Sequence, residues 1–438
     1  MRTRSITAMN DEGFGATIMA GLIRSAVHPL QALIAAPTLL FLAALTAMLF
    51  SHPEISFHEL NRVTFGFLVV GVLGRAVAGD RQLQCFDRAS WPMMALTAVA
   101  VISLIGRPVN DGTWGVLATK YLFPFALFHI AQLVFTGERE IRRFEIFALV
   151  ILSYLSFTAI AFLVGAHGLI FPRFILDDSL GIHAERARGP FLQAVANGVS
   201  LNLLALIVLH GYRRGTLRSR TALMVLASVP IAILATMTRA VWLSFAGSLL
   251  ALLFLSRNKQ LRLAFTAMLL VGAIGLGFVL STTQLGRRLD DRLKDGGPVD
   301  FRAAVYAGSW NMFQDRPLIG WGFHQMPAEL PRYVGEFHDK LLFPHDTYLE
   351  ILVENGLLGF FLYAWLMWEL WRLGRGKVLR QKAGAWLDPD LRRAWPIFLA
   401  VYWVNATFVV MSYYFVNGLL FTVAGIVAAR RRAAEVGS

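Results

Sequence analysis

The residues best suited to chemistry lie in a polar stretch that separates two apolar segments. His345 and Asp346 stand in FPHDTYLEILVENG, directly before a long apolar run. Thr347 and Glu350 match a capping box, which predicts a helix that begins at Thr347 with Thr347 as its cap. His345 would lie just outside this N-terminus, whose positive end disfavours imidazolium. We expect a neutral imidazole able to accept a proton, as a general base does; the alternative is a histidine that only satisfies loop backbone.

Three arginines stand where they could bind an anionic group at one membrane face. Arg188 precedes an apolar run in HAERARGPFLQAVANG, Arg239 separates two apolar runs in ATMTRAVWL, and Arg302 opens a short loop segment. Converging guanidinium groups offer planar sets of donors that suit a diphosphate. Each arginine alone also fits interfacial snorkelling. Arg188 and Arg239, however, flank apolar runs on the side where positive charge should be scarce.

Arg186, Asp346 and Lys120 are supporting candidates. Lys120 lies inside an apolar run, where an unpaired charge is costly, so it either contacts substrate or pairs with an acid. The histidines and acids show no metal-ligand spacing, and the single cysteine, Cys85, cannot form an internal disulfide. Phosphate-binding, dinucleotide-binding and nucleophilic-serine motifs are absent from the sequence. The prediction is a site of histidine and arginine side chains without metal or cofactor.

The composition indicates that the helices that position these residues lie in a membrane. The chain is 56% hydrophobic and 16% charged, with a mean hydropathy of +0.56, whereas soluble proteins carry about 25% charged residues. Continuous apolar runs of about 17–25 residues, enough to cross the bilayer as helix, recur along the chain. A β-barrel is excluded because its strands alternate every second residue. The fold class is therefore all-α, a polytopic integral membrane protein.

We predict twelve transmembrane helices with both termini cytoplasmic. Most of the 41 lysines and arginines then fall in inner loops, as the positive-inside rule requires. The net charge of +13 follows from this topology, so we expect the lipid bilayer and no nucleic acid as a partner. The predicted spans are residues 31–50, 63–79, 92–106, 116–136, 144–166, 191–211, 221–238, 240–255, 263–280, 349–371, 395–412 and 415–429.

Residues 1–438 are expected to form a single membrane domain with two long outer loops. The first covers residues 167–190, and the second covers residues 281–345, between the ninth and tenth spans. Asp300 predicts an N-capped short helix in the second loop, and the glycines of PLIGWG predict a turn after it. The first apolar run lacks a signal-peptide cleavage pattern, so we expect it to remain as the first span.

Three motifs make the chain resemble the superfamily of O-antigen ligases and O-antigen polymerases. They are Arg188-Gly189-Pro190-Phe191, Thr238-Arg239-Ala240, and the stretch from PLIGWG to HDTYLEILVENGLLG, Pro317 through Gly359. The resemblance extends to the twelve spans and to the large outer loop before the tenth. Members commonly have His-Asn where this chain has His345-Asp346, which puts in doubt any role that requires an amide at that position.

The resemblance implies a membrane glycosyltransferase of the bacterial inner membrane, with its loops and active site on the periplasmic side. Such enzymes move a glycan from undecaprenyl diphosphate to a hydroxyl acceptor without a metal or cofactor. His345 would be the general base, and Arg188, with Arg239 or Arg302, would bind the diphosphate. Direct displacement would invert the anomeric carbon.

Three functions remain open at this point. In a ligase the acceptor is lipid A-core, and we favour it slightly because one outer loop dominates. In a polymerase of O-antigen or exopolysaccharide, the acceptor is another carrier-linked repeat unit. The third function, a lipid or solute transporter, predicts ionisable groups near the membrane midplane. Lys120 and Arg75 would then line a continuous path across the membrane.

Overall fold

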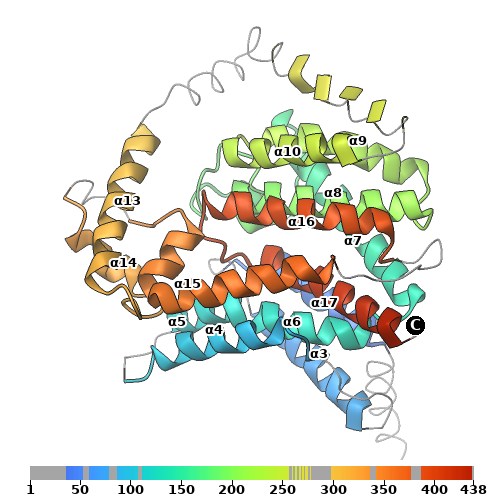
Figure 1. Ribbon diagram of the computed structural model, residues 1–438. Coiled ribbons are helices and arrows are strands. Elements are labelled where there is room, and N and C mark those ends of the chain that lie inside the picture. Colours follow the sequence, from blue (N-terminus) through green and yellow to red (C-terminus); the bar gives the residue numbers. More distant parts are fainter. Residues whose placement is uncertain are drawn as a thin grey trace, which may run out of the picture.

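The computed structural model describes residues 36–52, 59–77, 86–106, 111–255, 297–335, 342–375 and 386–436, with scattered residues between 259 and 277 (Figure 1). Helices and connecting loops make up this part of the chain, and it contains no β-strand. The principal elements are α2 (Pro37–Leu49), α3 (Leu60–Val77), α4 (Ser90–Ile102), α5 (Asp111–Leu117), a π-helical turn η1 (Ala118–Leu122), α6 (Phe123–Val134), α7 (Glu138–Leu163), α8 (Ala194–Arg214), α9 (Arg220–Ala235), α10 (Arg239–Leu255), α13 (Gly297–Asp315), α14 (Met326–Glu329), α15 (Thr347–Leu373), α16 (Pro389–Ala406) and α17 (Tyr414–Val436).

Five helical segments are long and apolar enough to cross a membrane. They are α3, the α5–α6 segment, α7, α8 and α15. Four shorter apolar helices, α2, α4, α9 and α10, accompany them. The all-helical fold class is thus confirmed for the described residues, whereas the count of twelve spans is not. The predicted ninth span, residues 263–280, lies mostly outside the described residues.

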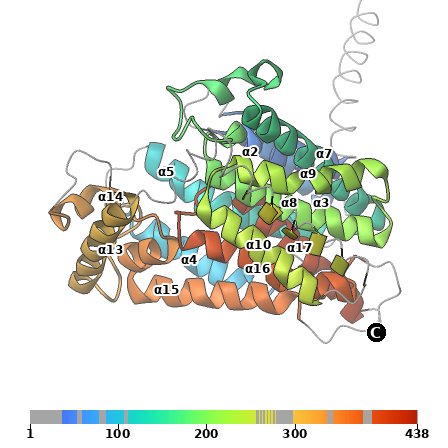
Figure 2. The ribbon, with the colours of Figure 1, turned by 90° about the horizontal axis from the view of Figure 1, so that it is seen from above.

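The α8 helix lies in the interior of the bundle. It packs against α7, α9, α10 and α16, and most of it is buried (Figure 2). Small and polar side chains, Asn197, Ser200 and Asn202, let neighbouring helices approach closely. The α17 helix is also buried, against α6 and α2. The N-terminal ends of both helices lie at the cavity described below.

The connections between helices gather at two opposite ends of the bundle. At one end, predicted inner loops share ion pairs: Arg213 with Asp390 at 2.6 Å, Arg214 with Glu145 at 2.8 Å and Arg430 with Glu138 at 3.1 Å. At the other end, predicted outer loops bond to one another, as when Ala187 N donates to Ala235 O at 3.1 Å. These contacts therefore join segments that the topology prediction assigns to the same side of the membrane.

The PLIGWG turn is docked against a break in α15. Gly356 has φ 63° and ψ −165°, a conformation that is essentially confined to glycine. Added there, a Cβ would lie 2.4 Å from the Leu318 carbonyl carbon. The break frees backbone groups of α15, and the turn satisfies them. The bonds are Trp321 N to Val353 O (3.0 Å), Gly322 N to Glu354 O (2.7 Å), Leu357 N to Pro317 O (2.8 Å) and Leu358 N to Leu318 O (3.1 Å).

The loop helix α13 also differs from its prediction. It begins at Gly297, so Asp300 lies in its first turn and is not its N-cap. An acidic residue there still favours the helix, because it faces the positive end of the helix dipole. The helix carries Arg302 and packs against α15, which brings the large outer loop to the end of α15 where His345 lies (Figure 1).

Candidate functional site

His345 lies at the N-terminal end of α15 in a left-handed backbone conformation, with φ 47°. Its ring is half-buried and meets the Phe301 ring edge-on, with centroids 6.2 Å apart. Burial lowers the pKa of His345, and the positive charges of Arg302 and His183 lower it further. The neutral imidazole expected from the sequence is therefore favoured, although burial contributes more than any other cause.

Asp346, and not Thr347, caps α15. The Asp346 side chain accepts a hydrogen bond from Leu349 N at 2.9 Å, which satisfies one of the free amides of the first turn. Thr347 is the first helical residue; its Oγ1 donates to Val409 O at 2.8 Å and accepts from Met411 N at 2.9 Å. The capping-box assignment was wrong because the aspartate one position earlier provides the cap.

Replacing Asp346 with asparagine should leave the glycan transfer that the resemblance implies within about twofold of wild type, because asparagine caps helices as well as aspartate does. Asp346→Ala should cost about 1 kcal/mol of stability and reduce activity as His345 loses its fixed position. Thermal unfolding and turnover of the two purified variants test this. A large activity loss in Asp346→Asn at normal stability would instead assign the carboxylate a direct role.

Arg188 is almost fully buried, with 1% of its surface exposed. Its guanidinium group donates to the carbonyl oxygens of Ile175 (3.1 Å from Nε), Leu180 and Asp177. These contacts fold the first long loop around the side chain. Arg188 thus holds the backbone of the loop, and its donors face carbonyl groups of the protein instead of an open surface.

Arg239 and Arg302 have a different environment. Arg239 is exposed at the start of α10, and Arg302 is partly exposed on α13, close enough to His345 to influence its pKa. Neither has an acidic partner within the described residues. Arg186 lies 3.3 Å from the Glu185 carboxylate. The Ala187–Ala235 hydrogen bond brings the loop that carries Arg186 to the turn before Arg239.

Lys120 forms a buried ion pair. Its Nζ lies 2.5 Å from Glu350 Oε2, and the two side chains are 9% and 8% exposed. The π-helical turn η1 contains Lys120; such turns add a residue to a helix and are frequent at functional sites. The pair joins η1 to α15 one turn below His345. Of the two roles considered for Lys120, the structure shows the pairing with an acid.

A cavity of about 660 Å³ opens beside these residues. Its wall combines hydroxyl, amide and imidazole groups with aromatic rings, a mixture that suits a sugar. The lining includes Asn61, Thr119, Gln193, His324, Ser412 and Tyr413. Gly181 and Ile182 also line it, and the charge of the next residue, His183, helps to lower the pKa of His345. The first long loop therefore supplies both part of the cavity wall and a charge that acts on His345.

Several of these groups have no signal in the sequence. His183 and His324 lie in loops without a recognisable motif, and Glu350 fits a capping box that the helix does not use. Lys120 and Glu350 meet in the folded protein, where they form an ion pair. His324, which has a left-handed backbone conformation, lies near this pair. Within the described residues, no group of three or more His, Cys, Asp or Glu side chains could hold a metal ion.

Comparison with known proteins bears on this arrangement. No curated protein matches the chain. The part of the chain from residue 221 to residue 364 contains Arg239, Arg302, His324 and His345, and it extends from the first turn of α9 to the middle of α15. These residues, 221–364, match the family model described as O-antigen ligase, so this part of the chain is similar to that family.

Proposed function

We propose that this protein is a glycosyltransferase of the bacterial inner membrane that acts as an O-antigen ligase. It takes a glycan from undecaprenyl diphosphate and transfers it to a hydroxyl of lipid A-core on the periplasmic side, with both termini cytoplasmic. One observation carries this proposal. The match to the O-antigen ligase family covers Arg239, Arg302 and His345, and Arg302 lies near enough to His345 for its charge to lower the pKa of the imidazole.

The reaction follows from the charges of these groups. The acceptor oxygen attacks the anomeric carbon as the bond from that carbon to the diphosphate oxygen breaks. The hydroxyl proton passes to the neutral imidazole of His345, and the diphosphate leaves with the bonding electrons. Attack from the side opposite the leaving group inverts the configuration. Arg302 and Arg239 bind the diphosphate and stabilise its growing charge, whereas Arg188 holds the loop that adjoins them.

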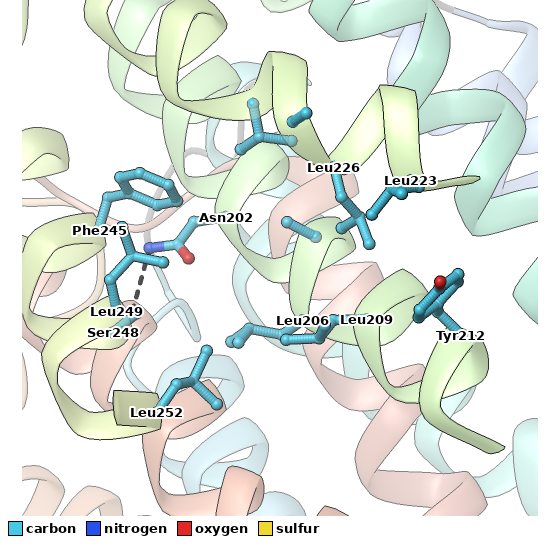
Figure 3. Close-up of a pocket in the computed structure, with 13 residues that line it drawn as sticks. Asn202, Leu206, Leu209, Tyr212, Leu223, Leu226, Phe245, Ser248, Leu249 and Leu252 are labelled. Atoms are coloured by element: carbon cyan, nitrogen blue, oxygen red, sulfur yellow. Dashed lines mark hydrogen bonds between the residues drawn. The ribbon is translucent and has the colours of Figure 1, made fainter. Parts of the chain in front are cut away.

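The carrier lipid has a pocket of its own. An apolar pocket of about 130 Å³ lies between α8, α9 and α10 (Figure 3). Leucines and Phe245 surround it, and a hydrogen bond of 3.4 Å joins Asn202 to Ser248 at one wall. Phe245 lies six residues after Arg239, about 9 Å along the helix. A diphosphate at Arg239 would therefore direct its prenyl chain along α10 into this pocket.

Filling this pocket should impair long-chain donors selectively. Leu249 lines the pocket and is 6% exposed, whereas its neighbour Leu250 is 44% exposed and lies outside the lining. We expect Leu249→Trp to raise the apparent KM for an undecaprenyl donor about tenfold, equivalent to about 1.4 kcal/mol. The KM for a donor with a short prenyl chain should remain unchanged.

Leu250→Trp is the matched control and should leave both KM values near those of wild type. Steady-state kinetics with the two donors in detergent measure the effect. If Leu249→Trp impaired both donors equally, the pocket would have no part in binding the prenyl chain.

The transporter alternative is less well supported by this structure. It requires Lys120 and Arg75 along one path through the membrane. Lys120 is instead bound to Glu350, and the lining of the 660 Å³ cavity includes neither Lys120 nor Arg75. Several polar groups that line the cavity, among them Gln193, His324 and Ser412, lie in loops between helices, which supports an enzyme that works at a membrane surface.

The test uses purified full-length protein with a polyprenyl-diphosphate-linked glycan, with and without lipid A-core, and reads products by mass spectrometry. A ligase produces glycosylated lipid A-core only when that acceptor is present. Extension of the carrier-linked glycan without lipid A-core would replace this proposal with a polymerase. The absence of product in both mixtures would overturn both.

A further inference from the structure

His324 occupies an unusual position in the large outer loop. It has a left-handed backbone, with φ 57°, and its half-buried side chain lines the 660 Å³ cavity. A non-glycine residue in this conformation costs about 1–2 kcal/mol. The surrounding structure must therefore hold it in place. Two sets of contacts position the loop around it, and a third interaction decides the charge of its imidazole.

The first contacts anchor the preceding residue, Phe323. Its ring is fully buried and lies 5.8 Å from the Tyr121 ring, and the Lys120 ammonium group lies 5.7 Å from the ring centroid. Its backbone N–H donates to Ser103 Oγ at 2.9 Å. These contacts attach the loop to the end of α4 and to the π-helical turn η1.

The second contacts come from α15, at its break. The Glu354 side chain is buried there, and its carboxylate lies close to the backbone N–H groups of His324 and Met326. Gly322 N donates to Glu354 O at 2.7 Å. The backbone and the side chain of Glu354 thus both lie against the loop that carries His324. The PLIGWG turn, two residues away, is held by the same break.

The third interaction is electrostatic, and it decides whether the imidazole of His324 is neutral or protonated. Burial lowers the pKa of His324, and the positive charge of Lys120 lowers it further, while Glu350 acts in the opposite direction. A neutral imidazole donates through one ring nitrogen and accepts through the other. This pair of functions matches a sugar hydroxyl, which also donates and accepts.

We propose that His324 is a substrate-contacting residue that binds a hydroxyl group of the acceptor glycan in the 660 Å³ cavity. This inference rests on the proposed function. The acceptor is favoured over the donor because the two pockets lie in different parts of the bundle. The pocket assigned to the prenyl chain lies between α8, α9 and α10, whereas residues of α2, α3 and α5 line the cavity together with His324.

Two substitutions test this without disturbing the backbone. Glycine adopts the left-handed conformation freely and asparagine tolerates it, so His324→Gly removes only the imidazole and His324→Asn retains a hydrogen-bonding side chain. Loss of one neutral hydrogen bond, about 1 kcal/mol net, should raise the KM for lipid A-core about five- to tenfold. The donor KM and kcat should stay near wild type, and His324→Asn should recover part of the loss.

His167→Gly is the matched control, because His167 lies on the first long loop outside the cavity lining; it should behave as wild type. A second measurement, binding of lipid A-core to the detergent-purified protein by thermophoresis, does not depend on turnover. Weaker binding in His324→Gly supports the inference even if wild type transfers nothing, which would overturn only the proposed function. Normal binding and an unchanged acceptor KM in His324→Gly would overturn the inference.

Discussion

Replacing His345 with asparagine should reduce kcat by about 100- to 10,000-fold, the range that general-base catalysis contributes. Asparagine tolerates the left-handed backbone at φ 47°, so the variant should fold as wild type does. It cannot accept a proton at neutral pH, which is the property that the reaction requires. Single-turnover transfer to lipid A-core measures the loss, and thermal unfolding checks the fold.

The pH dependence distinguishes a base from a residue that only positions substrate. Burial and Arg302 both lower the pKa of His345, so the imidazole stays neutral down to a pH below the ordinary histidine value of about 6.5. We expect kcat/KM to decline only below that pH. Removing the charge in Arg302→Gln should raise the pKa and shift the decline to higher pH.

Arg316→Gln serves as the control, because Arg316 follows the same helix but stacks on Trp321, 4.2 Å from its ring centroid, instead of facing His345. Its pH profile should match that of wild type. Near-normal turnover in His345→Asn would show that His345 is not the base. So would a decline of kcat/KM that occurs at the same pH in Arg302→Gln as in wild type.

Replacing Lys120 with methionine should destabilise the protein by about 3–5 kcal/mol, because it leaves the Glu350 carboxylate buried without its partner. The cost arises from the isolated charge and not from lost packing, since methionine fills a similar volume. The reciprocal change, Glu350→Gln, leaves a buried ammonium group and should be destabilising for the same reason. Thermal unfolding of detergent-purified protein measures both.

The double variant Lys120→Met with Glu350→Gln removes both charges. It should recover most of the lost stability, because a buried ion pair replaced by neutral groups often costs little. Stability of Lys120→Met equal to wild type would show that the pair contributes nothing. A double variant no more stable than either single variant would mean that the cost comes from packing at the π-helical turn.

The His345 and Lys120 substitutions both act at the N-terminal end of α15. His345 lies immediately before α15, and Glu350 lies in its first turn. Further along the same helix, Glu354 meets the backbone of His324. The helix therefore joins the proposed base, the buried ion pair and the cavity wall. A substitution that shifts this end of α15 should affect all three together.

The sequence by itself determined the class of protein and the local elements around His345. Long apolar runs can satisfy their backbone groups in lipid only as helices, so composition alone established an all-helical membrane protein. It also placed His345 directly before a helix and predicted the turn at PLIGWG. The reason is that helix starts, glycine turns and apolar runs are local, and neighbouring residues decide them.

Only the tertiary structure decided the partners of the charged residues. Lys120 and Glu350 are 230 positions apart in the sequence. No sequence pattern around either residue predicts that the other is its partner. Arg188 looked like a ligand for diphosphate, yet its donors are directed at loop carbonyls. His183 and His324 reach the site through folded loops. A buried charge requires a partner of opposite charge. The packing of helices that are distant in the sequence determines which residue becomes that partner, and local sequence does not encode this packing.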